Sequence, residues 1–342
     1  MGNWCSASPS DEEERNLDSL EVSTIFELPL HKACRQGDLA SVKVLLSSND
    51  SSDINALNGA SQTPLIEACR AGKVQVAIYL IDTFDELNTL LVDDSGRQAI
   101  TYAAGSGMKE VVLKLLSCEG SDVNGGAKNG EGTTSTPLWH AACEGHAEVV
   151  KFLLRQEGVD VNATDSNHWS ALFQATRMGH VDVAEMLLSK GADPSLAGLP
   201  DLENPLHIAA VNGTANQVRI ADMLIRSAAA AGEDTEYINI RNRLGYTALI
   251  VAAIKGHTHL VRLLVQHGAD PNIRLPGGET ASLSALHLAC IKDYGEIASL
   301  LLGAGAAINY QDDDGMTAMN YAEEKGHVDC MQSLEAHRTS RF

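Results

Sequence analysis

Histidine and cysteine are the residues of this chain whose chemistry could build a catalytic or metal site. The 342 residues include 12 histidines and seven cysteines. His146 and Glu148 have the H-x-E spacing of one class of zinc site, but the P-C-x-x-C segment that completes such a site is missing. No phosphate-binding loop, zinc-protease, serine-hydrolase, dinucleotide-binding or kinase motif is present. We therefore predict no catalytic residue, no metal site and no cofactor, and we do not expect an enzyme.

The first six residues carry a different kind of chemistry, because Met1-Gly2-Asn3-Trp4-Cys5-Ser6 fits the N-myristoylation pattern with Gly2 as the acceptor. Cys5 lies where a second, thioester-linked acyl chain is commonly added, and the segment resembles the Met-Gly-Asn-x-Cys termini of plant calcium-dependent protein kinases. Stable anchoring needs two signals. Residues 1–27 contain seven acids and one base, so a polybasic second signal is excluded. We expect lipidation at Gly2 and Cys5, the alternative being an ordinary terminus that begins Met-Gly.

Composition limits the partner and the compartment. The formal charge of −20 argues against nucleic acid as a partner, because phosphate affinity comes mainly from clustered Lys and Arg. The cysteines form no C-x-x-C pair, which favours free thiols in a reducing compartment. No run of about 18 apolar residues and no signal-peptide core is present. We therefore predict a cytoplasmic protein, peripheral on a cytoplasmic membrane face through its lipid anchor.

A repeat of about 36 residues must position everything else. One copy contains Thr136-Pro137-Leu138, then Gly145-His146 and then Leu153-Leu154. Alignment on the Thr position gives repeat starts at 28, 63, 98, 136, 170, 204, 247, 284 and 317. Ser, Thr or Asn at most starts can cap a first helix, Gly nine residues later ends it, and Leu pairs mark a second helix. Because one such unit cannot bury its own apolar face, the units must stack.

This pattern resembles the ankyrin-repeat family over residues 28–337, in nine repeats. The resemblance implies an all-α solenoid of stacked helix-turn-helix units, with projecting β-hairpin-like loops and a concave binding face. Residues 1–27 then form an acidic tail, and residues 338–342 a C-terminal tail. Within the first tail, Ser10 and Glu13 fit a capping box, which predicts a short helix through Leu17 and Leu20 that covers the first repeat.

Several positions depart from the repeat. Leu28 and Gln98 stand at capping positions, which predicts weaker or shorter first helices there. Asp293-Tyr294 replaces Gly-His, which predicts a different turn in the eighth repeat. Insertions at 125–135 and 214–236 predict a lengthened hairpin and longer helices. The histidines at repeat positions are expected to hydrogen-bond neighbouring loops, and Cys34, Cys69 and Cys290 to occupy small buried slots.

The loop tips and helix ends of repeats 5 to 8 hold four bases and two acids and are rich in residues that dominate interfaces. From this strip we predict a partner-binding site made of Trp169, Arg177, Met178, Arg243, Leu244, Tyr246, Ile254, Lys255, Ile291 and Lys292. The alternative is that Trp169 and Tyr246 only pack on adjacent hairpins. The last repeat offers Asp313, Asp314, Glu323 and Glu324 instead, and is predicted to be a solvated cap.

These features predict a non-enzymatic scaffold or adaptor. It would bind a partner protein, through an apolar segment bearing acidic groups, and would be monomeric on its own. The alternative is a soluble regulatory subunit, inhibitor or assembly chaperone of an enzyme complex.

Overall fold

The computed structural model describes residues 28–47, 53–125, 135–232, 234–277 and 282–339. The two predicted acylation sites, the helix predicted through Leu17 and Leu20, and most of the 125–135 insertion lie outside these ranges. The chain forms two compact units, Met1–Pro137 (unit 1) and Leu138–Phe342 (unit 2).

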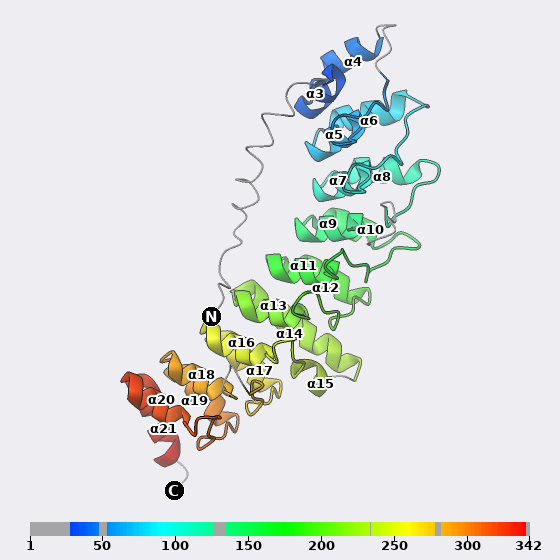
Figure 1. The fold of residues 1–342 in the computed structure, drawn as a ribbon. Coiled ribbons are helices and arrows are strands. Elements are labelled where there is room, and N and C mark those ends of the chain that lie inside the picture. Colours follow the sequence, from blue (N-terminus) through cyan, green and yellow to red (C-terminus); the bar gives the residue numbers. More distant parts are fainter. Residues whose placement is uncertain (1–27, 48–52, 126–134, 233, 278–281, 340–342) are drawn as a thin grey trace. The chain divides into compact units, whose positions relative to one another are not determined.

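Unit 1 consists of helix pairs in two layers, with α3, α5 and α7 in one layer and α4, α6 and α8 in the other (Figure 1). Their bounds are α3 Pro29–Gln36, α4 Leu39–Ser47, α5 Pro64–Arg70, α6 Val74–Thr83, α7 Ala99–Gly105 and α8 Lys109–Ser117.

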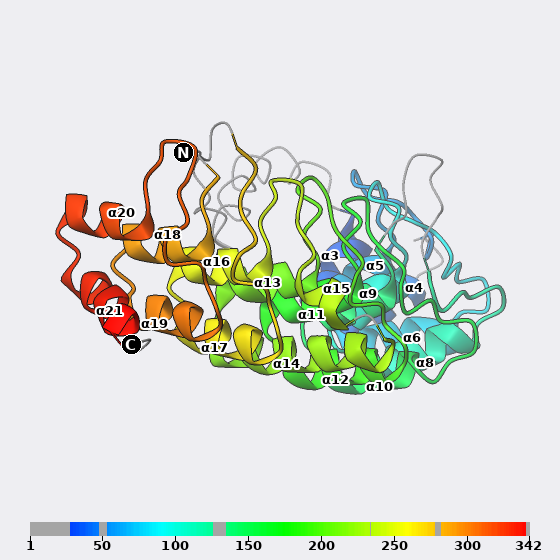
Figure 2. The same cartoon turned by 90° about the horizontal axis from the view of Figure 1, so that it is seen from below.

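Unit 2 repeats this arrangement, and the loops that precede its first helices project on one side (Figure 2). Its first helices are α9 Pro137–Cys143, α11 Ala171–Met178, α13 Pro205–Asn212, α16 Ala248–Lys255, α18 Ala285–Ile291 and α20 Ala318–Lys325. Its other helices are α10 Ala147–Leu153, α12 Val181–Ser189, α14 Ala215–Ala230, α15 Asp234–Ile238, α17 Thr258–Gln266, α19 Gly295–Gly303 and α21 Val328–Thr339. The 16-residue α14 and the short α15 correspond to the longer helices predicted for the 214–236 insertion.

Helix starts follow local capping chemistry. The Thr63 hydroxyl accepts a hydrogen bond from the Ile66 amide at 3.1 Å, and Ser170, Asn204, Thr247 and Thr317 cap their helices in the same way. Leu28 and Gln98 make no such side-chain bond. The expectation of shorter helices was nevertheless wrong: α3 has eight residues and α7 has seven, as many as the capped α5. Packing against neighbouring helices stabilises them.

The turn between the paired helices is the same in the eighth repeat as elsewhere, contrary to the prediction. Asp293 has φ +59°, which is the left-handed conformation that Gly256 adopts one repeat earlier with φ +77°. Tyr294 lies over Gly256 as His257 lies over Gly213, since a Cβ added to either glycine would clash with the ring. Asp tolerates the left-handed region better than most residues, so the backbone turn survives the substitution.

The projecting loops are held by Asp or Asn side chains and by isolated bridges. Bridges join Thr164 to Ser170 and Gly198 to Glu203, and further bridges of this kind close other loops. The Asp165 carboxylate accepts the Asn167 and Trp169 amides, each at 2.9 Å. Within the described residues, β-structure is limited to such bridges, which makes the fold all-α with hairpin-like loops.

The repeated histidines and cysteines have the structural roles predicted for them. His207 Nε2 donates to the Tyr246 carbonyl at 3.0 Å, and His180 Nε2 donates to the Cys143 carbonyl at 3.0 Å. Cys34, Cys69 and Cys290 are buried free thiols. Each of these histidines therefore ties one repeat to the next.

Candidate functional site

A line of side chains runs along one face of the first helices, and we call it the first-helix line. It consists of the residues four and seven positions after each repeat start, which share one helix face because they are three residues apart. Gln174 shows how the line continues from helix to helix. Its Oε1 accepts the Arg177 Nε–H at 2.9 Å on its own helix and contacts Cys143 Sγ of the preceding helix at 3.9 Å.

In the middle of unit 2 the first-helix line is entirely aliphatic. We call this part the apolar stripe, and its residues are Ile208 and Val211 of α13, Val251 and Ile254 of α16, and Leu288 and Ile291 of α18. Helix α16 packs against both α13 and α18, so the three pairs lie next to one another. Val251 is 8% exposed and the other five are half-buried, which leaves an apolar surface that water reaches.

Sequence reasoning found only part of this stripe. It placed Ile254 and Ile291 in the predicted site, left out the helix-end residue Val211, and missed Ile208, Val251 and Leu288. The missed residues lie three positions before the helix-end residues, on the same helix face, in three consecutive first helices. That spacing is the signal that could have found them.

One end of the stripe, on α13, meets an aromatic and cationic cluster that Trp169, just before α11, forms with two residues of α11. The Trp169 ring stacks on Phe173 with centroids 5.5 Å apart, and the Arg177 guanidinium lies 5.7 Å from the centre of the Trp169 ring. A Cβ built on Gly198 would clash with the Trp169 indole, so the ring packs directly on that backbone. Trp169 therefore does pack on the adjacent loop, as the alternative held, and is half-buried there. Met178, the last residue of α11, is 48% exposed.

The loop tips beside the stripe are connected by hydrogen bonds. Arg243 donates its backbone amide to the Asp201 carbonyl at 2.7 Å and its Nη1 to the Pro200 carbonyl at 3.2 Å. The Asn242 side chain accepts the amides of Leu244 and Tyr246. Tyr246 is half-buried, whereas Arg243 and Leu244 are exposed.

Two exposed leucines in these tips, Leu199 and Leu202, were missed from the sequence. They flank Pro200 and Asp201, and two leucines in a projecting loop would have indicated them.

Charges border the stripe on several sides. Lys255 and Lys292 directly follow Ile254 and Ile291 at the ends of α16 and α18. On the loop side, burial and the nearby Asp201 carboxylate raise the pKa of Glu203. The ten residues predicted from the sequence thus lie along the stripe, at its α11 end and on the adjoining loop tips.

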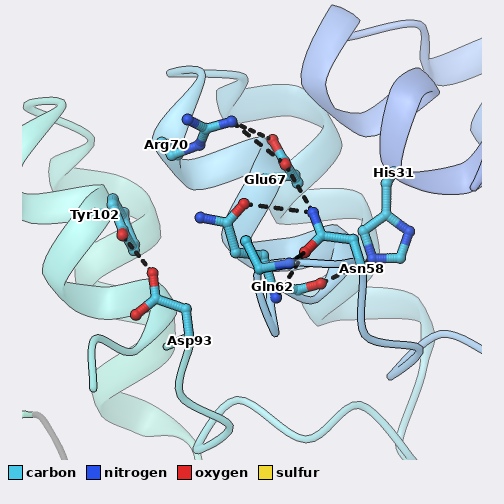
Figure 3. Close-up of polar contacts among 8 residues, drawn as sticks. His31, Asn58, Gln62, Glu67, Arg70, Asp93 and Tyr102 are labelled. Atoms are coloured by element: carbon cyan, nitrogen blue, oxygen red, sulfur yellow. Dashed lines mark hydrogen bonds and ion pairs between the residues drawn. The ribbon is translucent and has the colours of Figure 1, made fainter. Parts of the chain in front are cut away.

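The first-helix line of unit 1 carries polar and charged side chains, and Figure 3 shows three of them, Glu67, Arg70 and Tyr102. It begins with the exposed Lys32 and Arg35 of α3 and continues with Glu67 and Arg70 of α5. Glu67 is only 5% exposed. Its carboxylate is bound by Arg70 Nη2 at 3.1 Å and accepts a hydrogen bond from Asn58 Nδ2 at 3.1 Å.

The next residue of this line, Tyr102, donates its hydroxyl proton to Asp93 at 2.5 Å. Burial, and then the hydrogen bond to Asp93, raises the pKa of Tyr102. Polar groups in this part of unit 1 are thus bonded to one another.

The described residues contain no group of three or more His, Cys, Asp or Glu side chains that could hold a metal ion. None of the helices in the described ranges combines the length and apolar character needed to cross a bilayer.

Comparison with protein families decides the classification. The family described as ankyrin repeats (3 copies) matches residues 30–127, 124–198 and 196–275, and the family described as ankyrin repeats (many copies) matches 249–302 and 286–334. The chain belongs to the ankyrin-repeat family. Ankyrin repeats are in general non-catalytic modules that bind other proteins.

A solved structure and curated relatives support the same assignment. An ankyrin repeat domain from Acinetobacter baumannii AYE is 30% identical with a TM-score of 0.52, over 59% of this chain and 97% of that one. The E3 ubiquitin-protein ligase KEG of Arabidopsis thaliana is 25% identical over 86% of this chain and 20% of its own length. Ankyrin repeat and SOCS box protein 3 of Homo sapiens is 30% identical over 45% of this chain and 34% of its own length.

The target of rapamycin complex 2 subunit AVO2 of Saccharomyces cerevisiae is 31% identical over 48% of this chain and 36% of its own length. The chain thus spans about a fifth to about a third of the length of these three curated relatives. What is shared with them is the ankyrin array.

Proposed function

We propose that this ankyrin-repeat protein is an adaptor that binds a partner protein through the apolar stripe of unit 2, with Trp169, Arg177 and the loop tips contributing to the same interface. The observation that carries the proposal is the run of six aliphatic side chains on α13, α16 and α18, half-buried or nearly so. Aliphatic side chains on the exposed side of a helix layer gain free energy when a partner excludes water from them.

The chemistry of the border indicates the kind of segment that fits. Helices that pack side by side are about 8–10 Å apart, so three of them span roughly 20 Å. That distance accommodates about six extended residues or about 13 helical ones. Arg177, Arg243, Lys255 and Lys292 lie around the stripe, so acidic groups on either side of an apolar core would complement it.

Affinity purification with matched variants tests this function. Ile254→Ser combined with Ile291→Ser removes apolar surface from the stripe without adding charge. Val328→Ser is the control, because Val328 is an exposed aliphatic residue of α21, away from the stripe, in the same unit. We expect the unsubstituted chain and the control to capture a partner that the double variant does not capture. Equal capture by all three chains would place the interface elsewhere.

The proposal includes a membrane tether at Gly2 and Cys5, supported by the sequence pattern alone. Labelling with a clickable myristate analogue should mark the unsubstituted chain and leave Gly2→Ala unlabelled. Cys5→Ser should keep the myristate and yet shift the chain from the membrane fraction to the soluble one, because a single acyl chain binds marginally. Label that persists in Gly2→Ala, or membrane binding unchanged by Cys5→Ser, would contradict the tether.

A further inference from the structure

We propose that residues 17–26 of the acidic N-terminal segment dock on an open groove at the first helix pair and act as the cap of the ankyrin array. The groove lies between α3 and α4, has a volume of about 440 Å³, and is lined by residues that include Pro29, Ala33, Gln36, Ser41, Val44 and Leu45. It belongs to unit 1 alone and is separate from the apolar stripe.

Equivalent residues in the following repeats show that this face lacks a neighbour among the residues that the structure describes. Leu45 is half-buried, whereas its counterparts Leu80 and Leu115 are 0% and 2% exposed. Pro29 is exposed, whereas its counterpart Pro64 is buried. In the later repeats the preceding helix pair covers these positions, and at α3 and α4 no described residue does so.

The composition of the groove calls for an amphipathic occupant. Val44 is 67% exposed, and Leu28 beside the groove is 39% exposed, so apolar surface remains for a partner to cover. Ser41 stands where the next two repeats bury Val76 and Val111, and one base, Lys32, and one acid, Asp38, also line the groove. An occupant with apolar residues on one side and charged residues on the other suits this surface.

The segment directly before α3 has this composition. Residues 17–26 contain five apolar side chains, Leu17, Leu20, Val22, Ile25 and Phe26, together with the acids Asp18 and Glu21. Val22, Ile25 and Phe26 are spaced i, i+3, i+4, which is the spacing of an amphipathic helix.

Position in the chain favours this segment over any other occupant. Residue 26 is only three positions before Pro29, which itself lines the groove. So short a connection gives the segment a high effective concentration at the groove, and a second copy or a partner protein would have to displace it. Terminal repeats of such arrays generally need a cap.

A photo-cross-linker tests the contact directly in the full chain. p-Benzoylphenylalanine placed at position 44 should, after irradiation, join to a peptide from residues 17–26 within a single chain, and the product should have the mass of a monomer. A cross-linked dimer would assign the groove to a second copy, and a monomer with no product in residues 17–26 would leave the segment undocked. Either result overturns the proposal.

Hydrogen–deuterium exchange tests whether the contact stabilises the first repeat. Leu20→Asp with Ile25→Asp should speed exchange of the α3 and α4 amides by about tenfold, because the apolar contacts that cover them are lost. Ser19→Asp with Ser23→Asp adds the same charge to the same segment, removes no apolar side chain, and should leave exchange unchanged. Equal protection of α3 and α4 in both variants would contradict the cap.

Discussion

The first-helix line of unit 1 and the apolar stripe of unit 2 follow one backbone plan and present opposite chemistry. At equivalent positions, α5 of unit 1 carries Glu67 and Arg70, while α18 of unit 2 carries Leu288 and Ile291. The polar pair bonds within its own unit, since Arg70 and Asn58 both bind the Glu67 carboxylate. The aliphatic pair makes no such polar interaction. It gains free energy only when another molecule covers its exposed surface and excludes water. Satisfied polar groups stabilise their own unit, whereas half-exposed aliphatic groups favour binding.

The largest expected difference is in partner affinity after charge substitutions, which should weaken binding when they are made in the apolar stripe and not when they are made in the unit 1 line. Ile254→Asp with Leu288→Asp should weaken binding of the captured partner roughly 100- to 1,000-fold, because a central interface residue contributes about 2 kcal/mol or more. Lys32→Asp with Arg35→Asp makes the same kind of change at line positions of unit 1 and should leave affinity within about threefold. Isothermal titration calorimetry measures both. A comparable loss from the unit 1 variant would remove the distinction between the lines.

Acidification should next destabilise unit 2 through its buried histidines. Burial lowers the pKa of His207 from 6.5 to about 4, and burial also lowers the pKa of His287. Because the unfolded chain takes up the proton first, stability is complete above pH 6.5 and is lost as the pH falls towards 4. For His207 alone the loss between pH 7.5 and pH 5 is about 2 kcal/mol. Urea denaturation of unit 2 at the two pH values measures it.

The control for this pH effect copies the last repeat. There Asn320 Oδ1 accepts the Thr317 amide at 2.9 Å, so Asn completes the cap at the position that His207 occupies in α13. His207→Asn should lower stability at pH 7.5, since the hydrogen bond to the Tyr246 carbonyl is lost, and should flatten the pH dependence. An unchanged slope would show that the acid sensitivity arises elsewhere.

Converting the unit 1 line to the unit 2 type tests why the two differ. Glu67→Ala should cost about 1–3 kcal/mol of unfolding free energy, because it leaves the Asn58 amide only its longer contact with Gln62 Oε1 at 3.4 Å and empties a buried volume. Glu67→Leu with Arg70→Ile reproduces the Leu288 and Ile291 pair and should cost less than Glu67→Ala, since Asn58 loses the same acceptor in both variants but leucine refills the buried volume that alanine leaves empty. Thermal unfolding compares them, and a more costly double variant would refute the explanation.

The smallest expected effect concerns a contact that both units share. Tyr102 donates to Asp93, and Tyr321 donates to Asp312 at 2.6 Å, each between a first helix and its own loop. Tyr102→Phe and Tyr321→Phe should each cost about 1 kcal/mol, because each removes one hydrogen bond to a carboxylate. Equal losses by chemical denaturation would show that loop support is common to both units. A clear inequality would extend the difference between units beyond the first-helix line.

Much of the fold was predictable because the repeat makes local signals reinforce one another. Helices begin at the residue after each of Thr63, Ser170 and Thr247, as the capping rule predicts. Helices α3 and α7 form although Leu28 and Gln98 make no side-chain cap. Packing against neighbouring helices can therefore stabilise a helix that has no cap. Asp293 misled the prediction because its left-handed conformation is less common than that of glycine but still allowed.

The candidate site was only partly predictable. Trp169 and Arg177 were chosen for residue type, and the structure places them in contact with each other. Their role in binding a partner, like that of Gly2 and Cys5 in anchoring, remains a prediction. The spacing puts Leu288 and Ile208 on one helix face with Ile291 and Val211, but the sequence alone does not say that this face stays half-exposed.

The sequence by itself determined where helices begin, where paired helices turn, and that histidines and small cysteines have structural roles. These features depend on interactions within a few residues or on the exact recurrence of the repeat, so they can be derived without coordinates. Only the tertiary structure decided that six aliphatic side chains join into one stripe, that Glu67 is buried among its own polar partners, and that α3 and α4 leave a groove open. Exposure depends on what the neighbouring repeat covers, and that is a property of the stack.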